Sequence, residues 1–304
     1  MDRQTRTNAP ATQATVADRA VRRLAFGTMR LAGREVGHVR ACLDAALEAG
    51  LALIDTAPIY GAGGPGFGDA EARLGAAWAD APSLRDDAVL VTKAGIVPGQ
   101  PYDSAPATLA ASCEASLRRL GTDRIDLFLV HRPDHLAGHA AVGAALDRLV
   151  DAGKVRAVGV SNHTPAQVRA LAAHMRAPLA ANQVELSPLA PEAISDGTLD
   201  QCEERGLVPM TWSPLGGGRL IGDAPAPPRE AAVRAALDAI AARAGVGRDA
   251  AALAWALAHP AGAVPVLGTS NPARIAPAAR ALDVAVTRPE WYAVLEAARG
   301  APMP

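Results

Sequence analysis

The feature that most constrains the fold is a pattern that repeats along the chain from Leu24 onward. A short apolar run is followed by a break rich in Gly, Pro or Asp, and then by an Ala-, Leu- and Arg-rich stretch with helical spacing. Continuous apolar runs of this length are typical of parallel strands covered by helices. Eight such runs occur: LAFG (24–27), LALIDT (51–56), AVLVTK (88–93), DLFLVH (126–131), VRAVGVS (155–161), LAANQVE (179–185), LVPMTW (207–212) and VPVLGT (264–269).

Capping signals mark the helices between these runs. Ser104 precedes a proline-led helix that is expected to end at Leu120, and Thr164-Pro165 opens another, with proline in the first turn where its missing N–H costs nothing. Glycine follows several predicted helices and precedes the next strand, which fits a left-handed C-terminal cap; these residues are Gly50, Gly121, Gly153 and Gly206.

Eight strand–helix units of about 30 residues each predict a (β/α)8 TIM barrel, an α/β fold, with an extra C-terminal helix. We expect one domain over residues 21–304, preceded by a flexible polar extension over residues 1–20. A doubly wound sheet is the structural alternative, but no GxGxxG follows the first strand. The cluster GGPGFG (63–68) follows a different strand, and we interpret it as a flexible loop at the barrel mouth.

Composition excludes several classes of function. The formal net charge is −1 and no basic face is visible, so neither nucleic acid nor an anionic membrane is expected as a partner. The cysteines Cys42, Cys113 and Cys202 lie far apart and form no CxxC or Cys/His spacing, so we expect buried, inert thiols and no metal site. The first residues lack the apolar segment of a signal peptide, and no run is long enough to span a membrane, so a cytoplasmic location is expected.

Polar residues stand where the apolar runs end, and in a barrel such residues point into a common pocket. Asp55, Lys93 and His131 end successive runs, and Tyr60 follows Asp55 by five residues. Each residue alone has an ordinary explanation: Asp55 as a turn cap, Lys93 as a strand-end lysine, His131 as a wall residue and Tyr60 as a packing aromatic. Their conjunction at successive strand ends favours a catalytic site.

This set of residues makes chemical sense as an acid catalyst. Free tyrosine has a pKa of about 10, and a nearby ammonium stabilises the phenolate and lowers that pKa. Lys93 can supply the ammonium, Asp55 can hold Lys93 charged, and His131 can orient and polarise a carbonyl oxygen. Tyr60 would then donate a proton to an alkoxide as it forms.

The four residues resemble the Asp/Tyr/Lys/His tetrad of the aldo-keto reductases. The resemblance runs from about Leu24 to the final helix and suggests a bacterial branch of the family. Its motifs follow in the family's order: IDTAPIYG, VTKAG, LVHRPD, GKVRAVGVSNHTPAQV, NQVELSPL, WSPLGGGRL and PVLGT. It implies NADPH-dependent reduction of a small-molecule carbonyl, with Tyr60, Asp55, Lys93 and His131 as catalytic residues.

The resemblance also implies a set of cofactor-binding residues, which includes Asp55. Ser161, Asn162 and Gln183 match positions that bind the nicotinamide carboxamide, and Trp212 stands where the family usually stacks a tyrosine on the nicotinamide. The exit of the first strand beside the nicotinamide is matched by Gly27, Thr28 and Met29. The segment that covers the pyrophosphate is matched by Ser213, Pro214, Leu215, Gly217 and Arg219. The segment that binds the 2′-phosphate is matched by Gly268, Thr269, Ser270 and Arg274.

One departure concerns adenine. Many relatives carry a Glu-Asn pair that contacts adenine three and four residues after the phosphate-binding arginine, whereas this chain has Pro277 and Ala278. The resemblance therefore supplies no adenine contact there and leaves NADH open as an alternative cofactor.

Two other functions also stay open. A Schiff-base aldolase would place a lysine at a strand end of the same barrel, and a regulatory subunit would bind cofactor without turnover.

Overall fold

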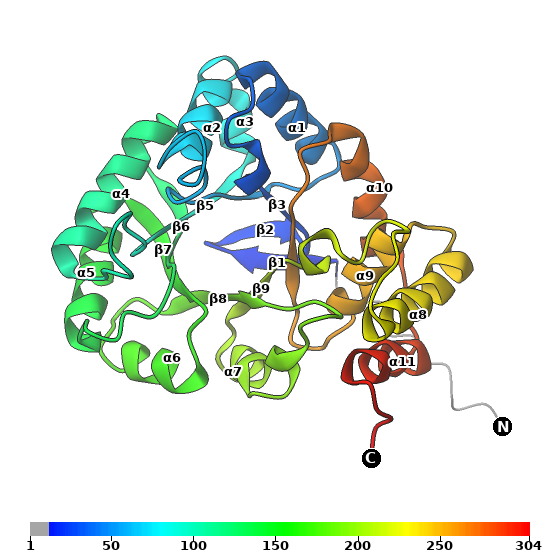
Figure 1. The fold of residues 1–304 in the computed structure, drawn as a ribbon. Coiled ribbons are helices and arrows are strands. Elements are labelled where there is room, and N and C mark those ends of the chain that lie inside the picture. Colours follow the sequence, from blue (N-terminus) through cyan, green and yellow to red (C-terminus); the bar gives the residue numbers. More distant parts are fainter. Residues whose placement is uncertain (1–11) are drawn as a thin grey trace.

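The computed structural model describes residues 12–304 and contains a closed barrel of parallel strands in the order β10-β3-β4-β5-β6-β7-β8-β9 (Figure 1). Each of the eight apolar runs forms one of these strands, so the predicted (β/α)8 barrel is confirmed. The strands are β3 (Ala25–Gly27), β4 (Leu53–Asp55), β5 (Val89–Ala94), β6 (Ile125–Val130), β7 (Val155–Ser161), β8 (Leu179–Glu185), β9 (Val208–Trp212) and β10 (Val264–Leu267).

Helices surround the barrel on its outside (Figure 1). Two of them lie between β9 and β10 in the chain, and the predicted extra C-terminal helix is α11. The helices are α1 (Val36–Glu48), α2 (Asp69–Ala79), α3 (Ser83–Asp87), α4 (Pro106–Leu120), α5 (His139–Asp151), α6 (Pro165–Ala172), α7 (Thr198–Arg205), α8 (Pro228–Ala244), α9 (Arg248–Leu257), α10 (Ile275–Ala279) and α11 (Arg288–Arg299).

The capping signals act as expected at two helices. Thr164 accepts a hydrogen bond from the Gln167 N–H while the Gln167 side chain accepts one from the Thr164 N–H, so a complete capping box starts α6. Gly121 ends α4 in the left-handed conformation, with φ of 61°. Local sequence therefore decides where these helices begin and end.

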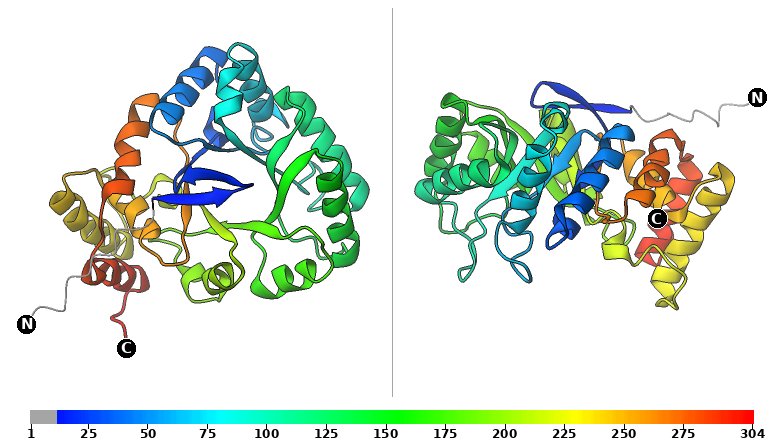
Figure 2. Two further views of the ribbon diagram at one scale, coloured as in Figure 1. Left: turned by 180° about the vertical axis from the view of Figure 1, so that it is seen from behind. Right: turned by 90° about the horizontal axis from the view of Figure 1, so that it is seen from above.

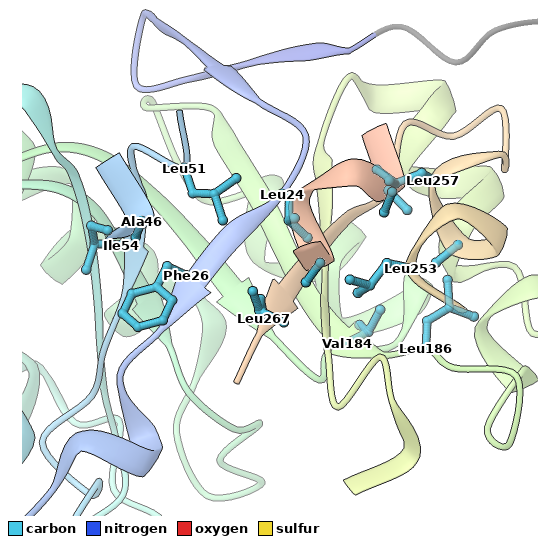
Figure 3. Packing of buried hydrophobic residues seen from close by; sticks show 14 of the residues in the cluster. Leu24, Phe26, Ala46, Leu51, Ile54, Val184, Leu186, Leu253, Leu257 and Leu267 are labelled. Carbon is cyan, nitrogen blue, oxygen red and sulfur yellow. The ribbon is translucent and has the colours of Figure 1, made fainter. Parts of the chain in front are cut away.

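The strands are apolar on both faces, yet successive side chains point in opposite directions. Leu53, Val91 and Leu129 belong to the cluster that fills the barrel interior. Their neighbours, such as Ile54 and Phe128, pack outward against the helices. Figure 3 shows part of this outer cluster, with Phe26, Ile54 and Leu267 of the strands and Leu253 of α9. This alternation explains why the runs read as continuous.

An antiparallel hairpin closes one end of the barrel. It consists of β1 (Gln13–Val16) and β2 (Arg19–Arg22), and it lies across the barrel opening when the molecule is seen from behind (Figure 2, left). Val16 and Val21 are buried against the interior cluster, and Arg19 donates to the Ala88 carbonyl. The flexible extension expected over residues 1–20 is therefore corrected for residues 12–20, while residues 1–11 lie outside the described part of the chain.

Helix α11 is held to the barrel by a pair of tryptophans. The rings of Trp255 in α9 and Trp291 in α11 stack with centroids 5.4 Å apart. Each indole N–H donates to the backbone carbonyl of the other residue, at 3.0 and 3.1 Å. Stacking and two satisfied donors together fix the C-terminal helix on α9.

Other expectations concern cysteines, metals and membranes. The three cysteines are free and buried, and burial raises the pKa of Cys202 to about 12 and that of Cys113 to about 11, which makes these thiols poor nucleophiles. Within residues 12–304, no group of His, Cys, Asp and Glu side chains has a metal-binding arrangement. No helix in the same range is long and apolar enough to cross a membrane.

Candidate active site

The strand alternation places the predicted tetrad inside the barrel. Asp55, Lys93 and His131 each come two residues after an interior side chain, namely Leu53, Val91 and Leu129. Because the period of a strand is two, all three side chains continue the interior face, and they do so at the carboxyl ends of β4, β5 and β6. Ser161, Gln183 and Trp212 occupy the equivalent positions of β7, β8 and β9.

Lys93 lies at the centre of the site and is fully buried. Its ammonium nitrogen Nζ is 2.8 Å and 2.9 Å from the two carboxylate oxygens of Asp55, 3.0 Å from the Thr56 carbonyl and 3.0 Å from the hydroxyl oxygen of Tyr60. Tyr60 in turn donates to Asp55 Oδ2 over 3.4 Å. The structure thus brings three of the four predicted catalytic residues into one hydrogen-bonded group.

Burial and charge act in opposite directions on this group. Burial raises the pKa of the Tyr60 hydroxyl, the Lys93 ammonium lowers it, and Asp55 raises it again; the net shift is upward. The sequence-based expectation that Lys93 brings this pKa below that of free tyrosine is therefore wrong for the protein alone, because burial outweighs the ammonium. Burial on its own lowers the pKa of Lys93, but Asp55 and Tyr60 more than compensate, so that pKa is raised.

His131 completes the group from the next strand. Its ring meets the Tyr60 ring edge-on, with centroids 6.2 Å apart and an interplanar angle of 85°. Burial lowers the pKa of His131 to about 2, and the charges of Lys93 and Arg132 add to this effect. His131 is therefore neutral at physiological pH and can donate one hydrogen bond without carrying a charge.

Three polar side chains link the tetrad to β7 and β8. Gln183 Nε2 donates to Asp55 Oδ1 over 2.8 Å, and Ser161 Oγ donates to the Gln183 carbonyl over 2.8 Å. Asn162 Nδ2 donates to Ser161 Oγ and to the His131 carbonyl. The predicted carboxamide-binding residues are thus brought together beside Asp55.

Two residues at the cavity wall have left-handed backbone conformations although neither is glycine. Asn162 has φ of 58° and follows β7, and Ser213 has φ of 51° and follows β9. Such conformations cost roughly 1–3 kcal/mol and are concentrated at functional sites. Trp212 also lies at this wall, and its Nε1–H donates to Asn162 Oδ1 over 2.9 Å, which orients the Asn162 side-chain amide.

A cavity of about 750 Å³ connects these residues with the ends of β9 and β10. Its lining includes Tyr60, Asp55 and His131 and every predicted cofactor-binding residue except Thr28, which is buried away from it. Lys93 is also absent from the wall, because it lies behind Tyr60 and Asp55. None of the glycines of the 63–68 loop lines the cavity.

The far end of the cavity is suited to phosphate. Gly216, Gly217 and Gly218 follow β9 with φ of 59°, 70° and 98°, a left-handed run whose N–H groups can converge on an anion. Arg219 and Arg274 line the same region. Arg274 is exposed, and no carboxylate among residues 12–304 pairs with it.

Three charged lining residues were not indicated by the sequence. Arg30 lies in the 3-10 helix Met29–Leu31 after β3, Arg234 belongs to α8 and Asp249 to the first turn of α9. Arg132 also lines the cavity, directly after the predicted catalytic residue His131. Arg234 and Asp249 are helical charges, and without the packing of α8 and α9 nothing in the sequence distinguishes them from solvated ones.

Comparisons with known proteins assign the chain to a family. The profile of the Aldo/keto reductase family matches residues 23–299. The chain is 49% identical over 288 residues to 6-dehydroglucose reductase of Novosphingobium aromaticivorans, covering 94% of each protein. It is 42% identical over 290 residues to 6-dehydroglucose reductase of Agrobacterium fabrum, covering 91% of this chain and 94% of that protein. Among solved structures, a glycerol dehydrogenase from Gluconobacter oxydans superposes with a TM-score of 0.84 at 27% identity, covering 96% of this chain and 97% of that one.

Proposed function

The chain belongs to the aldo/keto reductase family and is an oxidoreductase acting on carbonyl or CH–OH groups, and from this premise we propose that it reduces a sugar aldehyde with NADPH, using Tyr60 as the proton donor. The observation that carries the proposal is the buried group in which Lys93 contacts both Asp55 and the Tyr60 hydroxyl.

Each member of the group has a distinct task in this proposal. Tyr60 donates its proton to the carbonyl oxygen, and its raised pKa keeps it protonated until the oxygen gains negative charge. Lys93 stabilises the phenolate that remains, and Asp55 keeps Lys93 charged inside the barrel. His131 is neutral and orients the carbonyl oxygen without competing as an acid.

The residues along the cavity fit a nicotinamide dinucleotide. Ser161, Asn162 and Gln183 offer amide and hydroxyl groups beside Asp55, and the three-glycine run after β9 offers N–H groups for a pyrophosphate. When bound, the cofactor supplies the hydride that the chain itself cannot provide. Trp212 gives the cavity an aromatic face near the tetrad.

Arg274 carries the proposed preference for NADPH over NADH. Its unpaired guanidinium can form charge-assisted hydrogen bonds with a 2′-phosphate, each worth about 1.5–3 kcal/mol. Arg274→Ala should therefore weaken NADPH binding roughly ten- to a hundred-fold and leave NADH binding unchanged. Titration of tryptophan fluorescence with each cofactor measures both affinities, and an equal loss for the two cofactors would remove Arg274 from this role.

The proposed substrate class comes from the curated relatives. Both are named for reduction of 6-dehydroglucose, a hexose with an aldehyde at carbon 6. We expect NADPH consumption with 6-dehydroglucose at a higher kcat/KM than with simple aldehydes such as propanal. Tyr60→Phe should lower the rate by about 10²–10⁴-fold, because a general acid is lost, while NADPH binding stays intact. A parallel loss of cofactor affinity would contradict the assignment of Tyr60.

The geometry disfavours the aldolase alternative. The nucleophile of a Schiff-base enzyme is a neutral, accessible amine. Lys93 instead has a raised pKa, is fully buried and donates to Asp55, Thr56 and Tyr60. Borohydride in the presence of substrate should leave Lys93 unmodified. A regulatory subunit without turnover is set aside by the family assignment and by the enzyme activity of the relatives' names.

A further inference from the structure

Arg132 is the residue directly after His131, and the proposed reaction gives it no task. Its side chain lines the same 750 Å³ cavity as Tyr60 and His131. The guanidinium carbon lies 5.6 Å from the centre of the Trp212 ring, in a cation–π arrangement. Arg132 is therefore held over an aromatic face at the tetrad end of the cavity.

Within residues 12–304, the Arg132 guanidinium has no hydrogen-bond or ion-pair partner: no carboxylate lies within salt-bridge distance, and no side-chain hydrogen bond forms. Two of the arginines nearer the phosphate end, Arg219 and Arg234, differ in this respect. Arg219 pairs with Glu230, and Arg234 pairs with Glu230 and also donates to two backbone carbonyls. Arg132 thus keeps its planar set of donors available to a ligand.

The barrel order separates Arg132 from the phosphate end. Arg274 follows β10, whereas Arg132 follows β6, which lies opposite β10 in the closed ring of eight strands. A cofactor with phosphates at β9 and β10 leaves Arg132 without a phosphate to bind. The donors of Arg132 are therefore left available for a group of the substrate.

A nearby carboxylate indicates which kind of substrate group fits. Burial raises the pKa of Glu185, at the end of β8, and the charges of Glu192, Arg132 and Arg219 act on it as well, the two arginines lowering it. Glu185 is exposed and is not among the residues that line the cavity, so its charge acts on the Arg132 end of the cavity only over a distance. That charge favours neutral hydroxyl oxygens, which accept hydrogen bonds from a guanidinium, over a second carboxylate.

We propose that Arg132 is a specificity-determining residue that binds the hydroxyl groups next to the reacting carbonyl, and so selects polyhydroxylated aldehydes. This inference rests on the proposed function, because it assumes that the carbonyl lies at Tyr60 and His131. The planar fork of Arg132 can donate two parallel bonds to neighbouring hydroxyl oxygens, whereas a lysine would offer only a point charge.

Two aldehydes of equal length test the proposal. Glyceraldehyde carries two hydroxyl groups that propanal lacks, so the ratio of their kcat/KM values reports recognition of hydroxyls. Arg132→Met should lower this ratio roughly ten- to a hundred-fold, and Arg132→Lys should restore part of it. Arg148→Met, which removes an exposed arginine of α5 outside the cavity, is the control and should leave the ratio unchanged.

Other outcomes would overturn the proposal. If Arg132→Met lowers both aldehydes equally, Arg132 acts on the reaction rather than on hydroxyls. If only the ratio of succinic semialdehyde to butanal falls, the residue binds a carboxylate. Calorimetric titration with glucose, the product expected from 6-dehydroglucose, separates failure of this inference from failure of the proposed function. Binding by the wild-type protein that is lost in Arg132→Met supports the role of Arg132 even without turnover, and absence of wild-type binding contradicts it.

Discussion

Lys93 has three hydrogen-bond donors, and the protein supplies a partner for each: the Asp55 carboxylate, the Thr56 carbonyl and the Tyr60 hydroxyl. A buried ammonium is stable only when it is paired and hydrogen-bonded in this way. The same contacts that make Lys93 tolerable inside the barrel also place its charge 3.0 Å from the oxygen of Tyr60. Stability and the proposed acid chemistry thus share one set of contacts.

Removal of this charge should move the titration of Tyr60. In the proposed mechanism, alcohol oxidation is the reverse reaction and needs Tyr60 as a phenolate, so its rate should rise with pH up to the pKa of Tyr60. Burial already raises that pKa and Lys93 is the main group that lowers it. Lys93→Met should therefore shift the rise to higher pH, measured as kcat/KM against pH for the oxidation of an alcohol.

The only other lysine of the chain gives the control. Lys154 is paired with Glu114 on the protein surface, away from the cavity. Lys154→Met should leave the pH profile where it is. A Lys93→Met enzyme that remains folded, by its thermal melting curve, and shows an unshifted profile would mean that Lys93 does not tune Tyr60.

The tetrad could be predicted from the sequence because its residues end consecutive apolar runs, and a period of two then carries them to the interior face. The raised pKa of Tyr60 could not be predicted from the sequence. Burial raises this pKa more than the Lys93 ammonium lowers it, and burial depends on packing from distant strands. Arg234 and Asp249 were missed for a related reason: helices α8 and α9 bring them to the cavity, and helical spacing alone does not reveal which charged residues face it.

At the level of elements, α2 and α4 meet at an unusually close contact. A Cβ atom at Gly75 would lie 2.2 Å from the Arg119 carbonyl oxygen and 3.0 Å from the Leu120 backbone. Backbone atoms of a helix cannot move aside as a side-chain tip can. Gly75 therefore sets the distance between the two helices that cover β5, the strand that carries Lys93.

Gly75→Ala should destabilise the protein by about 1–3 kcal/mol, the usual cost of overpacking. Gly63 is the matched control, because its added Cβ would meet no atom within 4 Å. Urea denaturation measures the effect as a lower midpoint for Gly75→Ala and an unchanged midpoint for Gly63→Ala. Equal midpoints for the two variants would show that α2 and α4 tolerate a methyl group between them.

The elements themselves were predictable wherever local signals were strong. The proline and capping residues at Pro106, Thr164 and Gly121 mark helix ends that the structure confirms. The hairpin of β1 and β2 was not predicted, because its strands are short and polar, with Val16 and Val21 as their buried contacts to the interior. Packing against the open end of the barrel stabilises this hairpin, and such packing between distant segments cannot be read from the hairpin's own sequence.

For the whole molecule, buried histidines should determine how stability depends on pH. Burial lowers the pKa of His131 to about 2 and that of His163 to about 4, and it also lowers that of His259. Free histidine titrates near a pKa of about 6.5. Below that pH the histidines are protonated in the unfolded chain but stay neutral in the folded protein. Their contribution to the free energy of unfolding is therefore fully present above a pH of about 6.5 and is lost as the pH falls.

His163→Asn should reduce this loss. A histidine that is protonated only in the unfolded chain lowers the free energy of unfolding by about 1.4 kcal/mol for each pH unit below its free pKa. Between roughly pH 6.5 and 5, the slope of that free energy against pH should therefore be smaller in the variant than in the wild type, by up to about 1.4 kcal/mol per pH unit. The carboxylates are the same in both proteins, so the difference between the two slopes reports on His163. Denaturant unfolding of both proteins at several pH values measures the slopes, and parallel slopes would contradict a buried neutral His163.

The central claim is that this barrel reduces an aldehyde with NADPH at Tyr60, and isotope transfer tests it most directly. The protein is mixed with 6-dehydroglucose and NADPH that carries deuterium at both positions of C4 of the nicotinamide, and the alcohol product is examined by mass spectrometry and NMR. We predict that one stereospecific C4 deuterium appears on carbon 6 of the glucose formed, with no exchange into water. Glucose formed without label, or NADPH that is not consumed at all, would contradict the account.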